Sequence, residues 1–362
     1  MAAKSAGGRR IGMRYPKDLA KGGTIGFLAP SFGCNTEPYR SAFDHALDRW
    51  QGMGYRTVTG PNCYVGEGVG ISNTPEKCAA EVMEMFCGKE ADVLISCGGG
   101  ELMCEILEHV DFRRLAQADP KWFMGYSDNT NLVYPLVTLC DTAAIYGPCA
   151  AAFGMEPWHS SIGDAYQLLT GEKRVVESYP LWEKESLRDE ENPLQPYHVT
   201  EPLALKVYAE GRFVMDPGQA GTKLNASGRL LGGCMDCLVN LLGTGYDGTA
   251  AFCEKYKEDG ILWMLEACDL NVMSIRRAMW QMEQAGWFRY VKGFLFGRAL
   301  NSQPMMDLDA CQAVLAVASK YHVPVIMDLD IGHLSPMMPL VVGSVATVTL
   351  EGNHVRVGME YR

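Results

Sequence analysis

The chain has 362 residues, 48% of them hydrophobic, and this length suits two globular domains better than one. Its 43 acidic and 32 basic residues leave a formal net charge of −11, which argues against a nucleic-acid or anionic-membrane surface. The expected ligand is therefore a small molecule, and no apolar run approaches the ~20 residues of a membrane-spanning helix.

The first part of the chain alternates strands and helices regularly. In chain order we expect a strand at 24–29, a helix at 39–53, a strand at 56–58, a helix at 75–87, a strand at 92–96, a helix at 101–109, a strand at 122–124 and a helix from 130. This alternation is typical of a parallel sheet covered by helices, in which ligands bind beyond the carboxyl ends of the strands.

Between residues 179 and 203 charged residues and prolines crowd together, which predicts a linker or a long surface loop. A second α/β region follows, with strands at 204–209, 229–233, 260–265, 291–296 and 323–328, helices at 235–242, 274–285 and 307–321, and a last hairpin turning at 351–353. We therefore divide the chain into an N-terminal domain at 1–178, a charged insert at 179–203 and a C-terminal domain at 204–362.

The segment 125–129 places Ser127 where an apolar strand turns sharply into a helix. This is the arrangement of a nucleophile elbow, in which the backbone N–H after the serine and the helix N-terminus stabilise an oxyanion. The second glycine of the usual motif is missing, and Asn129 stands in its place. A serine at a helix start is also commonly a plain N-cap, so the local motif leaves both interpretations open.

Acyl transfer by a serine needs a base and an acid that orients the base. Of the seven histidines, we choose His333, which alone follows a strong buried strand and sits after a glycine in a turn-rich loop. Glu266 is our choice of acid, because it ends an apolar strand at the carboxyl edge of the sheet. A structural histidine and a solvated strand end are the alternatives, and the rival acids that spacing does not exclude are Asp269, Asp328 and Asp330.

Two glycine-rich strings suggest other ligands. The loop at 98–100 exposes backbone amides suited to an oxyanion or a phosphate, but it lacks the lysine and Ser/Thr of a P-loop. The string 243–248 matches G-x-G-x-x-G, but it follows an expected helix and not a strand, so we reject a dinucleotide site there.

The thirteen cysteines are an odd number, so at least one stays unpaired within the chain. The basic start of the chain lacks the apolar core of a secretory signal, and we expect a cytoplasmic protein with reduced thiols. Cys234 and Cys237 form the one close pair, which could hold zinc or carry redox chemistry, but no second pair accompanies it. Two core cysteines on a helix are the preferred interpretation.

Several motifs, in this order along the chain, resemble the LD-carboxypeptidase and microcin C immunity family of serine peptidases. They are Ala29-Pro30-Ser31, the glycine loop 98–100, the segment 121–130 around Ser127, the segment 228–233, Gly297-Arg298 and the segment 328–333. The resemblance runs from about residue 23 to residue 343, nearly the whole chain.

This resemblance implies an α/β fold with an N-terminal Rossmann-like domain and a C-terminal domain of the swivelling β/α type. It also implies that Ser127 attacks, that His333 is the general base and that Glu266 orients His333, in a groove between the domains. The implied oxyanion hole consists of backbone amides, those of Gly98, Gly99 and Asp128. No metal or organic cofactor is implied, and relatives are commonly homodimers.

The chain departs from the family's motifs at three places, so its substrate specificity does not follow from that of its relatives. These places are Cys234, where many relatives carry asparagine, Ala267-Cys268, where acidic residues are frequent, and Leu340 to Gly343, where Pro-Ile-Gly is common. The long insert is more like that of the immunity branch. Its Trp182 is a candidate to stack on a nucleobase, with anchoring of a mobile loop as the alternative. Glu101, next to the glycine loop, is a second candidate substrate contact.

We therefore predict a serine carboxypeptidase-type amide hydrolase that acts on a small peptide-like substrate through an acyl-enzyme on Ser127. LD-carboxypeptidase action on muropeptides, in peptidoglycan recycling, is the leading hypothesis. Cleavage of a peptidyl-nucleotide amide, as in microcin C immunity, is the alternative. The alternative from a different functional class is a protein of the same fold that binds a small ligand without catalysis.

Overall fold

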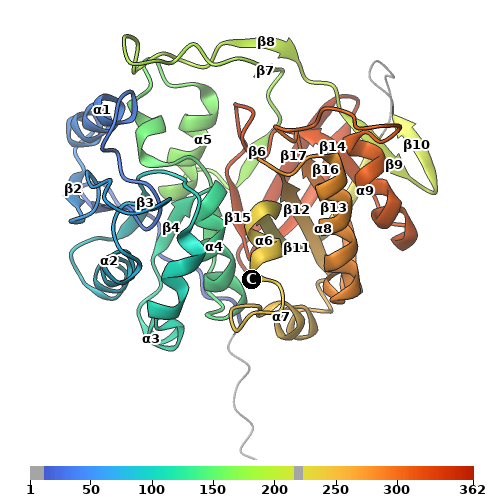
Figure 1. Ribbon diagram of the computed structural model, residues 1–362, viewed down its shortest axis with the longest axis horizontal. Coiled ribbons are helices and arrows are strands. Elements are labelled where there is room, and N and C mark those ends of the chain that lie inside the picture. Colours follow the sequence, from blue (N-terminus) through green and yellow to red (C-terminus); the bar gives the residue numbers. More distant parts are fainter. Residues whose placement is uncertain (1–11, 216–222) are drawn as a thin grey trace, which may run out of the picture.

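Two large β-sheets with helices on their faces make up most of the molecule (Figure 1). A computed structural model describes residues 12–215 and 223–362. The expectation of no secretory signal rests mostly on residues 1–11, which lie outside the described residues. Within the described ranges, none of the helices combines the length and apolar composition needed to cross a membrane.

The N-terminal sheet has six strands in the order β15-β5-β4-β3-β1-β2. Its members are β1 (Thr24–Leu28), β2 (Arg56–Thr59), β3 (Val93–Ser96), β4 (Trp122–Gly125), β5 (Ala144–Tyr146) and β15 (Leu340–Val342). β1 to β5 are parallel and β15 is antiparallel to β5. The helices of this half are α1 (Tyr39–Gly52), α2 (Pro75–Cys87), α3 (Phe112–Gln117), α4 (Thr130–Thr138) and α5 (Ser160–Leu169).

The connection from β1 leads to β2 on one side, and the next strand, β3, pairs with β1 on the other side. At such a switch point the loops after the two central strands diverge and leave a crevice at their carboxyl ends. The loops after β1 and β3 are residues 29–33 and 97–100, and the second contains the glycine run. The predicted parallel α/β architecture is confirmed, and its crevice lies beside the expected nucleophile.

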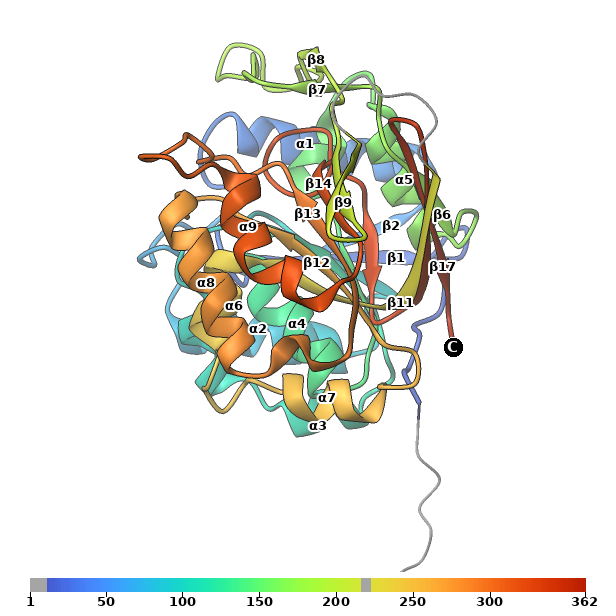
Figure 2. The same cartoon turned by 90° about the vertical axis from the view of Figure 1, so that its right-hand side faces the viewer.

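The C-terminal sheet has nine strands in the order β10-β9-β14-β13-β12-β11-β16-β17-β6 (Figure 2). Its parallel centre consists of β11 (Lys223–Cys234), β12 (Ile261–Glu266), β13 (Val291–Gly297) and β14 (Val325–Leu329). Antiparallel strands flank it: β6 (Val175–Glu177), β9 (Lys206–Ala209), β10 (Arg212–Met215), β16 (Val345–Glu351) and β17 (His354–Glu360). The helices here are α6 (Met235–Leu241), α7 (Thr249–Lys255), α8 (Val272–Gln284) and α9 (Ala310–Ala318).

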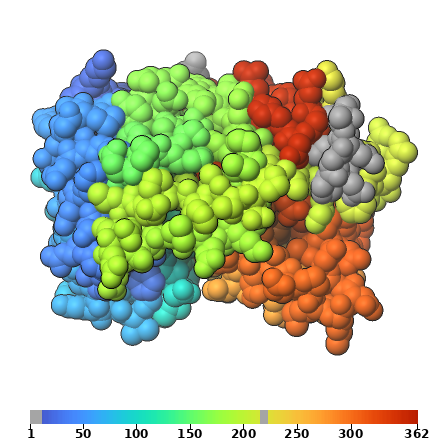
Figure 3. Space-filling model, turned by 90° about the horizontal axis from the view of Figure 1, so that it is seen from above, coloured from blue at the N-terminus to red at the C-terminus, as the bar shows by residue number. Residues whose placement is uncertain are grey.

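The charged insert contains a small sheet of its own, formed by β7 (Leu181–Glu183) and β8 (Val199–Pro202). Seen from above, the insert lies across the molecule between its two halves (Figure 3). The strand before it, β6, pairs in the C-terminal sheet, whereas β15 returns to the N-terminal sheet. The chain passes between the two large sheets three times, from β5 to β6, from β14 to β15 and from β15 to β16, so the boundaries at 178 and 203 stay a prediction from the sequence.

Several segments differ from the sequence prediction. The expected helix at 101–109 is a 3-10 helix at Met103–His109, in which Met103 is buried and its backbone N–H donates to the Asp128 carboxylate. The strand β5 and the helix α5 were not predicted, because β5 has only three residues and so no detectable period.

Candidate active site

Ser127 lies at a sharp turn between β4 and α4. Tyr126 is still extended, Ser127 has φ +62°, and a single 3-10 turn at Ser127–Asn129 leads into the helix. A positive φ is uncommon for a residue other than glycine, and such strain collects at functional positions. The turn therefore has the elbow geometry predicted from the sequence, although its motif lacks the second glycine.

Asn129, which takes the place of the motif's second glycine, forms two side-chain hydrogen bonds. Its side-chain amide donates to the carbonyl oxygens of Gly98, at 2.8 Å, and Tyr126, at 3.1 Å. Gly125 leaves the room for this side chain, since a Cβ at position 125 would lie 2.8 Å from Asn129 Cγ. The asparagine thus ties the elbow to the glycine loop, a function that a glycine could not perform.

Ser127, His333 and Glu266 form one hydrogen-bonded series. His333 Nε2 lies 2.8 Å from Ser127 Oγ, and His333 Nδ1 lies 2.9 Å from Glu266 Oε2. Glu266 is the last residue of β12 and is fully buried. Gly332, with φ +102°, lets the loop after β14 pass this close, because a Cβ there would lie 2.5 Å from Glu266 Oε2.

The pair of Glu266 and His333 is electrostatically coupled. Burial raises the pKa of the Glu266 carboxyl, but the charge of His333 and hydrogen bonds from His333 and Tyr146 outweigh it and leave that pKa below its ordinary value. Burial lowers the pKa of His333, but the negative charge of Glu266 and the hydrogen bonds of the imidazole act in the opposite direction. Together they outweigh burial, so the pKa of the imidazole is raised above its ordinary value. Each partner therefore favours the charged form of the other.

The rival acids have other partners. Asp330 is buried and accepts from Arg298 at 2.6 Å, and Asp328 pairs with Lys206 at 3.4 Å. The Asp269 carboxylate accepts from the Cys268 thiol at 3.9 Å. In the described part of the chain, the acid that hydrogen-bonds to the imidazole of His333 is Glu266.

Of the three expected oxyanion-hole residues, Gly99 lies beside the Ser127 hydroxyl, Gly98 precedes it in the glycine loop and Asp128 follows Ser127 in the chain. A Cβ on Gly99 would lie 3.2 Å from Ser127 Oγ, so the glycine loop passes directly beside the nucleophile. The Asp128 carboxylate points into the fold, where it accepts from Ser31 Oγ at 2.6 Å and from the Met103 N–H at 3.0 Å. Within residues 12–215 and 223–362, the backbone N–H groups of Gly98, Gly99 and Asp128 donate to no other residue. They are thus free for a ligand.

A cavity of about 770 Å³ opens beside Ser127 and His333. Its walls come from the loops after β1 and β3 and from the insert, which contributes Glu183, Ser186, Arg188, Gln195 and Tyr197. The size suits a small peptide-like molecule.

The two expected substrate contacts lie outside this lining. The Trp182 indole N–H donates to the Pro202 carbonyl, and its ring lies 5.1 Å from the Arg298 guanidinium. Glu101 is exposed, and its backbone N–H donates to the Gly70 carbonyl. Their roles in substrate binding stay predictions.

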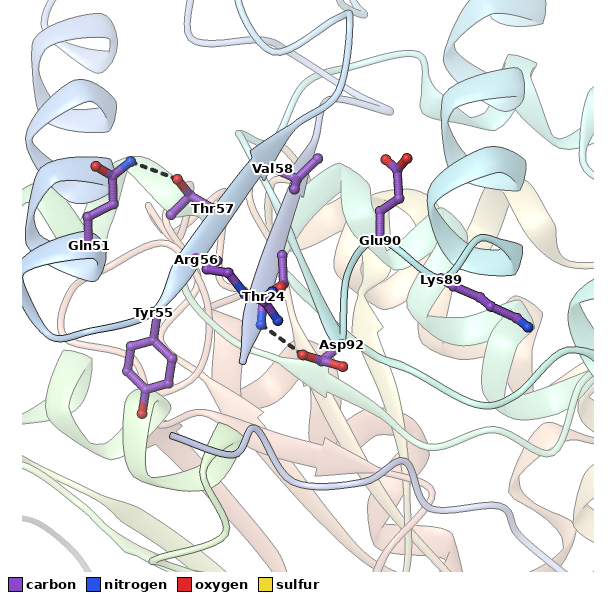
Figure 4. A pocket seen from close by; sticks show the side chains of 9 residues that line it. All are labelled: Thr24, Gln51, Tyr55, Arg56, Thr57, Val58, Lys89, Glu90 and Asp92. Atoms are coloured by element: carbon purple, nitrogen blue, oxygen red, sulfur yellow. Dashed lines mark hydrogen bonds between the residues drawn. The ribbon is translucent and has the colours of Figure 1, made fainter. Parts of the chain in front are cut away.

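A second cavity, of about 830 Å³, lies at the opposite edge of the N-terminal sheet (Figure 4). It is lined by Thr24 and Arg56, the first residues of β1 and β2, so it faces the amino ends of the strands. Gln51 bonds to Thr57 there, and the Thr24 N–H bonds to Asp92. Ligands of such sheets bind at the carboxyl ends, which favours the cavity at Ser127.

The sequence reasoning missed one residue at the centre of the site. The Tyr146 hydroxyl accepts from the Ser127 N–H at 3.1 Å and donates to Glu266 Oε1 at 2.6 Å. The only signal was a short apolar run, Ala143 to Tyr146, ended by Gly147-Pro148. Cys234 and Cys237, the candidate metal or redox pair, are buried free thiols, and no cluster suited to a metal occurs among the described residues.

Comparison with known proteins gives consistent results. A protein of Bacillus subtilis named "Probable murein peptide carboxypeptidase" is 24% identical to this chain over 338 residues. The match covers 92% of this chain and 91% of that protein. The microcin C7 self-immunity protein MccF of Escherichia coli is 22% identical over 351 residues, covering 95% of both chains. A solved structure of MccF in complex with glutamyl sulfamoyl guanosine superposes with a TM-score of 0.75 at 20% identity, covering 96% of this chain and 98% of that one.

Two family profiles also match, and together they span more than half of the chain. The LD-carboxypeptidase N-terminal domain matches residues 25–147, which include Ser127, and the LD-carboxypeptidase C-terminal domain matches residues 227–348, which include Glu266 and His333. The chain therefore belongs to the LD-carboxypeptidase family of serine peptidases, whose members include MccF.

Proposed function

We propose that this protein is a serine hydrolase that cleaves an amide near the carboxyl end of a small peptide-like substrate. The observation that carries the proposal is the relay of two hydrogen bonds, 2.8 Å from Ser127 to His333 and 2.9 Å from His333 to Glu266. A serine hydroxyl is scarcely ionised at neutral pH, and a base held at this distance removes its proton as the oxygen attacks.

The proposed reaction has two halves. His333 takes the proton of Ser127 while Oγ adds to the amide carbonyl, and the negative charge on the carbonyl oxygen is stabilised by the N–H groups of Asp128 and the glycine loop. The imidazolium, held by Glu266, then protonates the leaving amine and an acyl-enzyme remains on Ser127. Water, deprotonated by His333, releases the acyl group and restores the serine.

Muropeptides with a terminal D-amino acid are the leading substrate class, supported by the similarity to the murein peptide carboxypeptidase. A peptidyl-nucleotide amide is the second candidate. The observation that favours it is the insert that borders the cavity, together with the similarity to MccF over nearly the whole chain. We also propose that the protein is cytoplasmic and forms a homodimer.

The nucleophile is tested by labelling with a fluorophosphonate, which reacts with activated serines. We expect covalent labelling of the wild type at Ser127 and none in the Ser127→Ala variant, because the variant lacks the attacking oxygen. Ser335→Ala is a matched control, since Ser335 lines the same cavity and the hydrogen bond of His333 Nε2 in the described part of the chain goes to Ser127. A folded wild type that stays unlabelled would refute the hydrolase and favour a binding protein.

The substrate class is tested with wild-type enzyme that reacts with the fluorophosphonate. A muramoyl tetrapeptide and a peptidyl-nucleotide amide are offered to it in parallel. Release of a terminal D-amino acid supports the first class, and release of the aminoacyl or peptidyl group from the nucleotide supports the second. If Ser127 labels but neither compound is cut, both substrate proposals fail while the chemistry stands.

A further inference from the structure

Tyr146 joins two parts of the site that come from different sheets. It is the last residue of β5 in the N-terminal sheet, and its side chain is fully buried. Its hydroxyl oxygen lies 3.1 Å from the backbone nitrogen of Ser127 and 2.6 Å from Oε1 of Glu266, which ends β12 in the C-terminal sheet. The two groups that it touches are the backbone of the proposed nucleophile and the acid of the proposed triad.

The direction of the two hydrogen bonds is fixed by the number of protons. The Ser127 backbone can only donate, so the Tyr146 oxygen accepts from it, and the single phenolic proton is left for the Glu266 carboxylate. Burial, followed by the negative charge of Glu266, raises the pKa of the Tyr146 phenol well above its ordinary value. The raised pKa favours the protonated phenol, which is the form that donates to Glu266.

We propose that Tyr146 is a positioning residue of the site, which aligns Glu266 toward His333 and fixes the backbone of Ser127 in its strained turn. The inference rests on the proposed function. With Oε1 held by Tyr146 and Oε2 by His333, both carboxylate oxygens are occupied and the carboxylate cannot rotate. The Ser127 N–H, at a residue with φ +62°, likewise has a fixed acceptor.

This bridge has a consequence for the oxyanion hole. Because the Ser127 N–H is bonded to Tyr146, it is not free to stabilise charge on the substrate. The donors that remain beside Oγ are those of Asp128 and the glycine loop, as proposed above.

The same bridge sets the direction of a pH effect. A hydrogen bond from Tyr146 to Glu266 disperses charge on the carboxylate and weakens its hold on the His333 proton. Loss of that bond makes Glu266 a stronger acceptor and raises the pKa of His333 further. The pH at which His333 becomes the neutral base then moves upward.

Other titratable groups face the pair of Glu266 and His333 from neighbouring elements. Cys234 and Cys237 lie at the junction of β11 and α6, Cys268 follows β12, and the Tyr126 ring lies 5.3 Å from the His333 ring between centroids. All of them stay unchanged when only the hydroxyl of Tyr146 is removed. A shift seen in Tyr146→Phe therefore reports the lost bond to Glu266.

The test measures the rate of fluorophosphonate labelling at Ser127 as a function of pH. In Tyr146→Phe we expect the rate at neutral pH to fall about tenfold to a hundredfold, and its acid limb to move to higher pH, because one hydrogen bond to a charged group is lost. The matched control is Tyr134→Phe, since Tyr134 is also fully buried and its hydroxyl bonds across the two halves to Thr249 Oγ1 at 2.7 Å. That variant should keep the wild-type rate and limb.

The inference is overturned if Tyr146→Phe keeps the wild-type rate and pH limb, or if Tyr134→Phe changes both to the same extent. Should Tyr146→Phe fail to fold, 3-fluorotyrosine at position 146 keeps the shape and makes the hydroxyl a stronger donor, so the limb should move to lower pH; an unmoved limb overturns the inference. A wild type that does not label at all refutes the proposed function instead, which separates the two failures.

Discussion

The charges of Glu266 and His333 depend on each other, and this dependence controls when His333 can act as a base. The pKa of His333 lies above its ordinary value because the Glu266 carboxylate outweighs the effect of burial. A base works only in its neutral form, so the acid limb of kcat/KM should lie above the ordinary histidine range and activity should rise with pH through it.

Replacing Glu266 by glutamine tests this coupling. Glu266→Gln removes the negative charge while burial remains, so the pKa of His333 should fall and the acid limb of kcat/KM should move to lower pH. At the pH optimum kcat should drop by roughly 10²- to 10⁴-fold, because the imidazole loses the charged, acceptor-only partner that sets its tautomer and stabilises the imidazolium. Asp269→Asn, a change at one of the rival acids, should leave the limb in place. A limb that stays or rises in Glu266→Gln contradicts the assigned coupling.

At the scale of elements, a helix or strand can be predicted from the sequence when its pattern of apolar residues is long. The strand before Glu266, the helix-strand alternation and the turn at Ser127 each had a readable signal, and the structure brings Ser127, Glu266 and His333 together. Tyr146 had only a short apolar run before Gly147-Pro148, because the importance of its three-residue strand arises from the pairing with β4 and β15. The bonds of Asn129 likewise depend on the glycine loop, 31 residues away along the chain.

The charged insert contributes a cation to the cavity. Arg188 is the one lysine or arginine among the described residues that line the cavity, and its guanidinium lies 5.1 Å from the Tyr39 ring. Under the proposed function the substrate has a terminal carboxylate that needs a positive partner. Arg188→Gln should raise KM about tenfold for a peptide with a free terminal carboxylate and leave KM for the corresponding terminal amide unchanged.

Lys184 offers a control, because it is an exposed cation of the same insert and does not line the cavity. Lys184→Gln should keep the wild-type KM for both compounds. Equal changes in KM for the carboxylate and the amide would mean that Arg188 acts through the shape of the insert and not through its charge.

At the scale of the whole molecule, distant segments are joined at Arg229 in β11. Its guanidinium donates to the carbonyl oxygens of Gly343 at 2.6 Å and Arg362 at 2.9 Å, and to Tyr15 at 3.2 Å. It also forms an ion pair with Asp259 at 2.5 Å. These partners come from the first and last described segments and from the turn between β15 and β16, which is where the chain passes from one sheet to the other.

Arg229→Met should therefore affect stability more than chemistry. The side chain is 3% exposed, and its loss leaves the Asp259 carboxylate without its ion-pair partner and takes one of their donors from the Gly343 and Arg362 carbonyls, which keep the Tyr15 hydroxyl. We expect the free energy of unfolding in urea to fall by about 3 kcal/mol, as for other broken buried ion pairs. Arg356→Met, at a pair with Glu177 in which the arginine side chain is 58% exposed, should change it by no more than about 0.5 kcal/mol. The labelling rate of Ser127 per folded molecule should stay at the wild-type value in both variants, since neither residue touches the site. If Arg229→Met unfolds at the wild-type urea concentration, the two sheets are held together by their packing and not by this network.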